Sequence, residues 1–331
     1  MTEKAQPEQN LDTVEVQEDY TVLANGGKVI NFMKIALPFA IISIILTIVS
    51  IGSLATKGLN LGLDFTGGVS AELNYQHEVN NNQIVEKLTQ AGFKDVQVRN
   101  LGSNQDVMVR MPEQPQISAE NLSKEITTAV QIENNPVTVA KVDSVGSQLG
   151  NELYVRSAIA VGLALLLMLI YITVRFEFKL AVGSVLSLFH DIIVTLGIFS
   201  LFDWPFDLTV LAAVLAIIGF SLNDNIVVSD RIRENFRKIR GATAKEVINI
   251  ALTETLRRTI HTSVTLLLVV VAMLLMGGEG LRWFSVAMTI GVFVGTYSSI
   301  YIGTAYALWR NISAQDFLVK VKPEFEDEEL P

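Results

Sequence analysis

The chain has 331 residues, of which 50% are hydrophobic and only 18% are charged, and its mean hydropathy is +0.40. This composition is typical of a membrane protein and excludes an ordinary soluble domain. The absence of cysteine excludes disulfides, zinc–thiolate sites and iron–sulfur clusters. Much of the net charge of −9 lies near the two ends, so 1–28 and 309–331 are predicted to be solvated tails, the second of them acidic.

Six apolar runs are long enough to cross a bilayer, which takes about 20 residues in a helix. They lie at 35–55, 155–174, 180–202, 208–229, 259–276 and 284–308. The chain is therefore predicted to be a polytopic α-helical membrane protein with six transmembrane helices.

Lysine and arginine in the short connections predict the orientation of these helices. The connection 231–258 carries eight basic residues, whereas the turn 203–207 carries none. Basic connections stay in the cytoplasm, so both termini are predicted to be cytoplasmic. The long insert after the first helix is then outside.

The insert at 58–151 is predicted to be a small α+β domain. Strand-like alternation and helical spacing of apolar residues follow one another in the order βαββαβ. The strands are expected at 69–75, 95–101, 106–111 and 137–145, and the helices at 82–91 and 118–132. This order is that of a ferredoxin-like fold, and the insert contains no recognisable catalytic constellation.

Asp224 lies inside the fourth apolar run, five or six residues from its cytoplasmic end. That places the carboxylate about 8–9 Å along the helix from the membrane surface, at 1.5 Å per residue. A charge at the membrane centre costs ~2.5–3.5 kcal/mol, and less near an end. We therefore expect a partner charge, water or a proton at Asp224, with Asn223 as a neighbouring polar group.

Two further charged sites lie in or beside the helices. The pair His190 and Asp191, near the middle of the third run, is either a buried pair that satisfies backbone or Ser/Thr groups, or part of a polar relay or a structural brace beside one. Arg258 opens the fifth run at a depth similar to that of Asp224. A nearby arginine favours the charged carboxylate and burial favours the neutral one, and the sequence does not decide between them.

Three other features have more ordinary interpretations. Asp230 lies at the membrane surface and is expected to form an ion pair or to end a helix. The basic segment 231–258 resembles an amphipathic surface helix broken at Gly241, either packed on the membrane or used as a cytoplasmic contact site. Asp64 with Gly67 and Gly68 lies outside and predicts a turn or a strand bulge.

Four segments carry a resemblance to a known family. They are LGLDFTGG at 61–68, VGSQLG at 145–150, His190-Asp191, and FSLNDNIVVSDRIREN at 220–235. Over roughly 31–308, the chain is similar to the SecF family, the smaller membrane subunits of SecD–SecF protein-export complexes. The resemblance implies membership of the resistance-nodulation-division superfamily, a location in the bacterial inner membrane, and an ion relay that uses Asp224 and Arg258.

The resemblance also implies partners and an energy source. SecD would complete a twelve-helix bundle, and the SecYEG translocon, an unfolded preprotein and membrane lipids would be contacted, with YajC as a further candidate. A proton or sodium gradient would drive a late step of preprotein export. No enzyme activity, cofactor, metal or nucleic acid partner is expected, because the chain has no phosphate-binding loop and no metal-ligand motif.

Two alternatives to an ion-coupled export subunit remain open. One is a transporter subunit of the same superfamily that moves a small molecule or lipid, which would need a larger external domain with a pocket. The other is a non-conducting scaffold for the translocon, in which Asp224 is a structural member of an ion pair.

Overall fold

The computed structural model describes residues 23, 27–101, 103–113 and 119–317. Residues 1–22 and 318–331 of the predicted tails lie outside the described residues. The chain divides into two compact units, which are treated separately below. One contains Lys57–Leu165 with Phe199–Ala212, and the other contains Met1–Thr56, Leu166–Ile198 and Ala213–Pro331.

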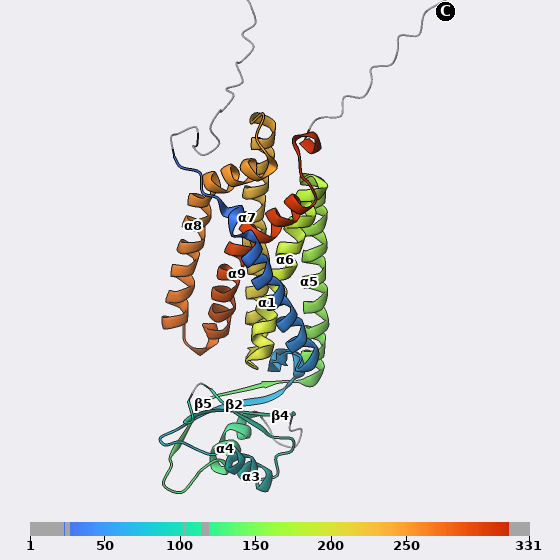
Figure 1. Cartoon of the computed structure of the whole chain (residues 1–331). Helices are drawn as coiled ribbons and strands as arrows, with labels where there is room; N and C mark the ends of the chain where they lie inside the picture. The colour runs from blue at the N-terminus through green and yellow to red at the C-terminus, as the bar shows by residue number, and fades with distance from the viewer. Residues whose placement is uncertain (1–22, 24–26, 102, 114–118, 318–331) are drawn as a thin grey trace, which may run out of the picture. The chain divides into compact units, whose positions relative to one another are not determined.

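A four-stranded antiparallel sheet with two helices forms the domain after the first long helix (Figure 1). Its elements are β2 (Gly68–Tyr75), α3 (Asn81–Gln90), β3 (Gln97–Asn100), β4 (Asp106–Met111), α4 (Ala119–Ala129) and β5 (Val137–Val145). The strand order β3-β4-β2-β5 places the third strand of the domain between the first and the second. This arrangement confirms the predicted ferredoxin-like βαββαβ fold.

Alternation along β2 explains the core of this domain. Val69, Ala71, Leu73 and Tyr75 are each at most 2% exposed and face the same side, as the two-residue period of a strand requires. The helices α3 and α4 cover that side with the apolar residues Ile84, Leu88, Leu122 and Ile126. The Tyr75 hydroxyl donates to the Val130 carbonyl at 2.9 Å, so its one buried polar atom is satisfied.

Within the described residues, six long helices confirm the predicted membrane architecture, because each is long and apolar enough to span a bilayer. They are α1 (Ala36–Thr56), α5 (Ser147–Arg175), α6 (Phe178–Leu201), α7 (Leu208–Lys238), α8 (Ala244–Met276) and α9 (Glu279–Trp309). Several extend beyond the apolar runs because a helix end is set by capping and turns, whereas hydropathy reports only the lipid-facing length.

The connection between α7 and α8 differs from the predicted separate segment at 231–258. The helix α7 continues to Lys238, and α8 already begins at Ala244, so most of this segment belongs to the two long helices. The predicted break is at Gly241, whose φ is +82°. Thr243 and Glu246 then form a capping box that starts α8.

The part of the C-terminal tail that is described, up to Phe317, packs on the helices. A short 3-10 helix at Ala314–Phe317 buries Phe317, whose ring stacks on Phe236 with a centroid distance of 5.2 Å. Lys179 pairs with Asp316 at 2.8 Å. Burial favours the neutral acid, but the hydrogen bonds from Lys179 and Ser313 outweigh it and lower the pKa of Asp316.

The six long helices differ in how much of their surface the chain itself covers. Within the most apolar window, 61% of the residues of α6 and α9 and 44% of those of α7 are buried. The corresponding shares are 17% for α1 and α8 and 6% for α5. The helices α6, α7 and α9 are therefore the core of the bundle.

Small residues allow the core helices to approach closely. A Cβ built on Gly183 of α6 would lie 2.4 Å from the carbonyl oxygen of Gly303 on α9. A Cβ on Gly197 of α6 would lie 2.1 Å from the Cβ of Ser50 on α1. Side chains larger than hydrogen do not fit at these crossings, so α6 packs backbone to backbone against α9.

Candidate functional site

The carboxylate of Asp224 is buried in the bundle, where only 4% of the residue is exposed. Its Oδ1 accepts a hydrogen bond from the Thr259 hydroxyl of α8 at 2.7 Å. Its Oδ2 accepts one from the Ser299 hydroxyl of α9 at 2.5 Å. We call Asp224, Thr259 and Ser299 the acid cluster, which joins three helices at one carboxyl group.

Hydroxyl partners suit an acid that changes its protonation state. A serine or threonine hydroxyl both donates and accepts, because its hydrogen rotates about the C–O bond. The acid cluster therefore satisfies a carboxylate, which only accepts, and equally a carboxylic acid, which must also donate. A lysine or arginine in direct contact would instead hold the site in its charged form.

Arg258 does not contact Asp224 in this way. Its side chain is exposed, and among the ion pairs of the described residues none includes Asp224. Arg258 directly precedes Thr259 in α8, so it is the chain neighbour of a residue of the acid cluster. The expected partner of the acid is thus brought near it, while the direct hydrogen bonds come from two hydroxyls that sequence reasoning missed.

His190 and Asp191 form a second buried group, the histidine cluster, with Ser221 and Tyr297. The His190 Nδ1 lies 3.1 Å from Asp191 Oδ1, and Nε2 lies 3.1 Å from the Tyr297 hydroxyl. Ser221 donates to Asp191 Oδ2 at 2.5 Å. Asp191 is 0% exposed, and its carboxylate has hydrogen-bond partners in His190 and Ser221 inside the bundle.

The two clusters are adjacent along two helices. On α7, Asp224 belongs to the acid cluster, and the next residue, Asn225, donates to the Ser221 carbonyl at 3.0 Å on the histidine side. On α9, Ser299 serves the acid cluster, and the neighbouring Ser298 accepts a hydrogen bond from α6 at 3.0 Å. A shift of α7 or α9 therefore changes the two clusters together, which suits both the brace and the relay interpretation.

Two other predicted residues lie away from the clusters. Asn223 is exposed, although it directly precedes Asp224. Asp230 accepts from Arg175 at 2.8 and 3.0 Å, which is the surface ion pair that its position suggested. Such an exposed pair contributes little to stability, typically about 0–1 kcal/mol.

The external motif occupies the other compact unit. Asp64 Oδ2 accepts a hydrogen bond from the Leu208 amide at 2.9 Å, at the first residue of α7. Gly67 ends the short helix α2 (Leu63–Thr66) with φ +67°, and Gly68 begins β2 with φ +110°. The glycines therefore form the turn from α2 into β2, in backbone conformations that side chains rarely adopt.

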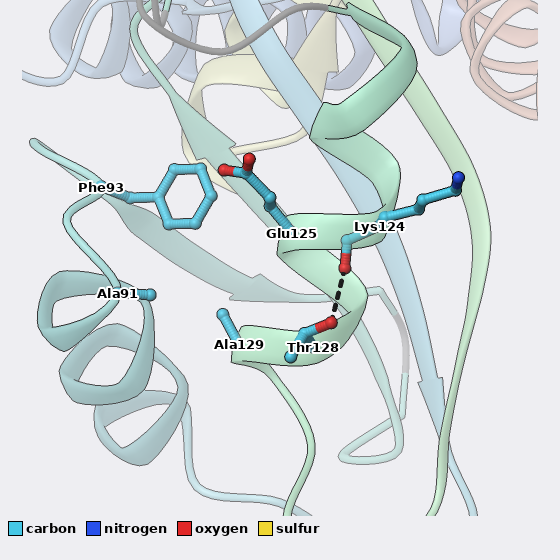
Figure 2. A pocket seen from close by; sticks show the side chains of 6 residues that line it. All are labelled: Ala91, Phe93, Lys124, Glu125, Thr128 and Ala129. Atoms are coloured by element: carbon cyan, nitrogen blue, oxygen red, sulfur yellow. Dashed lines mark hydrogen bonds between the residues drawn. The ribbon is translucent and has the colours of Figure 1, made fainter.

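A shallow depression of about 300 Å³ lies between the end of α3 and one face of α4 (Figure 2). Lys124 and Glu125 provide its charged side chains, and Phe93 and Ala129 provide its apolar ones. It contains no pair of acids and no histidine. No group of three potential metal ligands occurs among the residues that the structure describes.

Comparison with known proteins identifies the family. Residues 125–313 match the model "Protein export membrane protein SecD/SecF, C-terminal", and residues 52–79 match the SecD/SecF GG motif. A SecF protein translocase subunit of Pseudomonas aeruginosa is 45% identical over 292 residues, covering 87% of this chain and 94% of the relative. The chain belongs to the SecF family. A SecF subunit of Escherichia coli O157:H7 is 42% identical over 316 residues, covering 94% of this chain and 98% of the relative.

The SecF fold is also found in a solved structure. The crystal structure of SecDF from Thermus thermophilus, described as a translocon-associated membrane protein, matches with a TM-score of 0.77 and 34% identity. The match covers 86% of this chain but only 39% of that longer chain. Membership of the SecF family confirms a multi-pass membrane protein of protein export, and it confirms the prediction that the chain is not an enzyme.

Proposed function

We propose that this chain couples an ion gradient to a late step of preprotein export across the bacterial inner membrane, as the SecF partner of a SecD subunit. The observation that supports this proposal most directly is the acid cluster, in which two hydroxyls from two helices donate hydrogen bonds to a buried carboxylate. Such a site accommodates both protonation states, so the coupling ion that we favour is the proton. Sodium is the alternative, because carboxylate and hydroxyl oxygens also ligate hard cations.

Exposed polar side chains support a partner subunit against α7 and α8. Asn223 of α7 and Arg258 and His261 of α8 are exposed in this chain, although they lie in or beside membrane-spanning segments. Lipid tails do not satisfy such groups, so a protein surface or enclosed water must cover them. A SecD subunit fits this role, because this chain matches only 39% of the single-chain SecDF.

The proposal also includes the orientation of the chain in the membrane and its further contacts. Both termini are placed in the cytoplasm, since the basic connection between α7 and α8 belongs there. The domain that contains β2 to β5 then faces the opposite side, where it would meet preprotein leaving SecYEG. YajC remains a further candidate partner, and lipid covers the apolar faces of α1 and α5.

A translocon scaffold is the second candidate function. It is favoured by the same hydroxyl contacts, because a carboxylate with two donors already has hydrogen-bond partners without any ion passage. In that case Asp224 would only join α7, α8 and α9. The two functions differ in whether the proton on Asp224 matters.

Replacement of Asp224 by asparagine separates them, since the amide keeps the shape and hydrogen bonding but removes titration. The measurement is protease-protected preprotein in membrane vesicles, with and without a proton ionophore or a sodium ionophore. We expect Asp224→Asn to lose the gradient-stimulated part while SecD still co-purifies.

Asp230→Asn is the matched control, because it removes a carboxylate from the surface end of the same helix. It should retain gradient stimulation. Full stimulation in Asp224→Asn would exclude the relay, and a loss of SecD from the purified complex would favour the scaffold.

A further inference from the structure

Two chain segments far apart in sequence meet at the outer ends of the long helices. The strand β1 (Asn60–Leu61) pairs in parallel with β6 (Pro205–Phe206), and the Gly62 amide donates to the Phe206 carbonyl at 2.7 Å. We call residues 57–68 and 201–208 the outer junction. Both parts belong to the same compact unit as the external sheet.

Two carboxylates of the outer junction cap the first turn of α7. Asp207, at the N-cap position, accepts from the Val210 amide at 2.8 Å and from the Thr209 hydroxyl at 2.7 Å. Asp64 accepts from the Leu208 amide at 2.9 Å. The first amides of a helix have no acceptor within the helix, so both acids satisfy donors that would otherwise be unpaired. Only Asp64 comes from a segment 144 positions away.

Gly67 of the outer junction lies against the beginning of α5. A Cβ on Gly67 would lie 2.5 Å from Ser147 Cα, and a Cβ on Gly150 would lie 2.6 Å from the Gly67 nitrogen. The buried ring of Phe65 completes the contact between Tyr154 of α5 and Phe206, at centroid distances of 6.2 and 5.8 Å. Asp64, Phe65 and Gly67 thus contact the first residues of two spanning helices.

The external sheet is tied to the outer junction by its own arginines. Arg110 of β4 donates to the Asn60 side chain at 3.2 Å and to the Leu61 carbonyl at 3.0 Å. Arg99 of β3 pairs with Asp203. In addition, Gly68 continues directly into β2. A displacement of the sheet therefore reaches β1 and β6 without passing through a flexible linker.

We propose that Asp64 is a positioning residue that ties the external domain to α7, the helix that carries Asp224. The inference rests on the function proposed above. Asp207 alone would cap the helix, so capping does not by itself require the distant carboxylate. The Asp64 bond adds a mechanical connection, through which movement of the external sheet acts on the outer end of α7.

The test compares two caps of one helix end in the full chain with its SecD partner. Asp64→Ala removes the link between segments, Asp207→Ala removes only the local cap, and Asp64→Asn keeps an acceptor oxygen. We expect gradient-stimulated export to fall about fivefold in Asp64→Ala, which loses both a cap and the link between segments, and to change less in the other two, which keep that link. As a control, hydrogen exchange at the first turn of α7 should show that both alanine variants loosen the helix end.

A cross-link provides an independent rescue, because the chain has no cysteine of its own. Asn60 and Pro205 are partners in adjacent strands, which run about 4.8 Å apart and so within reach of a disulfide. Asn60→Cys with Pro205→Cys should restore export to Asp64→Ala when oxidised, and the restoration should disappear on reduction.

Different outcomes would overturn the inference about Asp64 and the proposed ion-coupled function. Equal losses in Asp64→Ala and Asp207→Ala would reduce Asp64 to a helix cap and overturn the inference. So would an oxidised cross-link that blocks export in the otherwise unchanged chain, because the strands would then have to separate. Wild-type export that does not respond to the gradient would overturn the proposed function itself. Full activity of Asp64→Ala in a chain that Asp224→Asn inactivates would overturn only the inference.

Discussion

Asp224 lies within α7, and Asp64 accepts a hydrogen bond from the first residue of the same helix; the partners of these two carboxylates differ in kind. Asp224 is held by rotatable hydroxyls that both donate and accept. Asp64 is held by a backbone amide, which only donates and whose direction is fixed by the helix. The first arrangement tolerates a change of protonation and the second does not. This difference assigns the switchable role to Asp224 and the fixed, mechanical role to Asp64.

The largest effect is expected when the acid cluster loses both hydroxyls. Thr259→Val with Ser299→Ala leaves the Asp224 carboxylate buried without donors, and gradient-stimulated export should fall as far as in Asp224→Asn. Each single substitution should cost about tenfold, since a hydrogen bond to a charged group contributes ~1.5 kcal/mol. The measurement is protease-protected preprotein in vesicles.

Thr262→Val is the control for this experiment. Thr262 lies on the same helix, but its hydroxyl donates to the Arg258 carbonyl within α8 and not to the acid. Its loss should leave export close to wild type. If the double variant of the acid cluster is equally active, the two hydroxyls have no part in the function of Asp224.

The next largest effect is expected at Gly67, in the outer junction that also contains Asp64. Gly67→Ala forces a Cβ to within 2.5 Å of the Ser147 backbone at φ +67°, and should destabilise the external unit by about 1–3 kcal/mol. Gly58→Ala is closely matched, because its φ is +71° but nothing lies within 4 Å. Proteolysis of the full chain in urea measures both variants. Equal effects would show that backbone strain, and not the contact with α5, explains the glycine.

An intermediate effect is expected at Arg258, the exposed cation that directly precedes Thr259 of the acid cluster. Arg258→Lys keeps the cation but loses the planar fork of the guanidinium, so we expect a partial loss of export. Arg257→Lys, one position earlier in α8 and likewise exposed, should have less effect. Activity of Arg258→Lys equal to wild type would show that charge alone is sufficient.

Sequence reasoning found what depends on local pattern and missed what depends on distant pairing. The apolar runs and the alternation in 58–151 predicted the six helices and the ferredoxin-like domain, because periodicity reports burial directly. Asp224 was visible because a charge in an apolar run is costly. Thr259 and Ser299 were not, since hydroxyls are common in membrane helices and nothing local distinguishes these two. The bond from Asp64 to Leu208 joins segments whose proximity only the fold creates.

The smallest effect is expected at Tyr75 in the external domain, whose hydroxyl is bonded to a backbone carbonyl. Burial raises the pKa of Tyr75 from 10.0 to about 12. The folded state therefore holds the hydroxyl proton over a range in which the unfolded chain releases it. Stability from this group is complete below pH 10 and decreases as the pH rises toward 12.

Tyr75→Phe should lose about 1 kcal/mol at neutral pH, because the Val130 carbonyl loses its donor, and should lack this alkaline component. Proteolysis of the full chain in urea, followed through peptides from 58–151 at pH 8 and pH 11, measures both quantities. An alkaline profile unchanged by Tyr75→Phe would show that a group other than Tyr75 is responsible for the loss of stability.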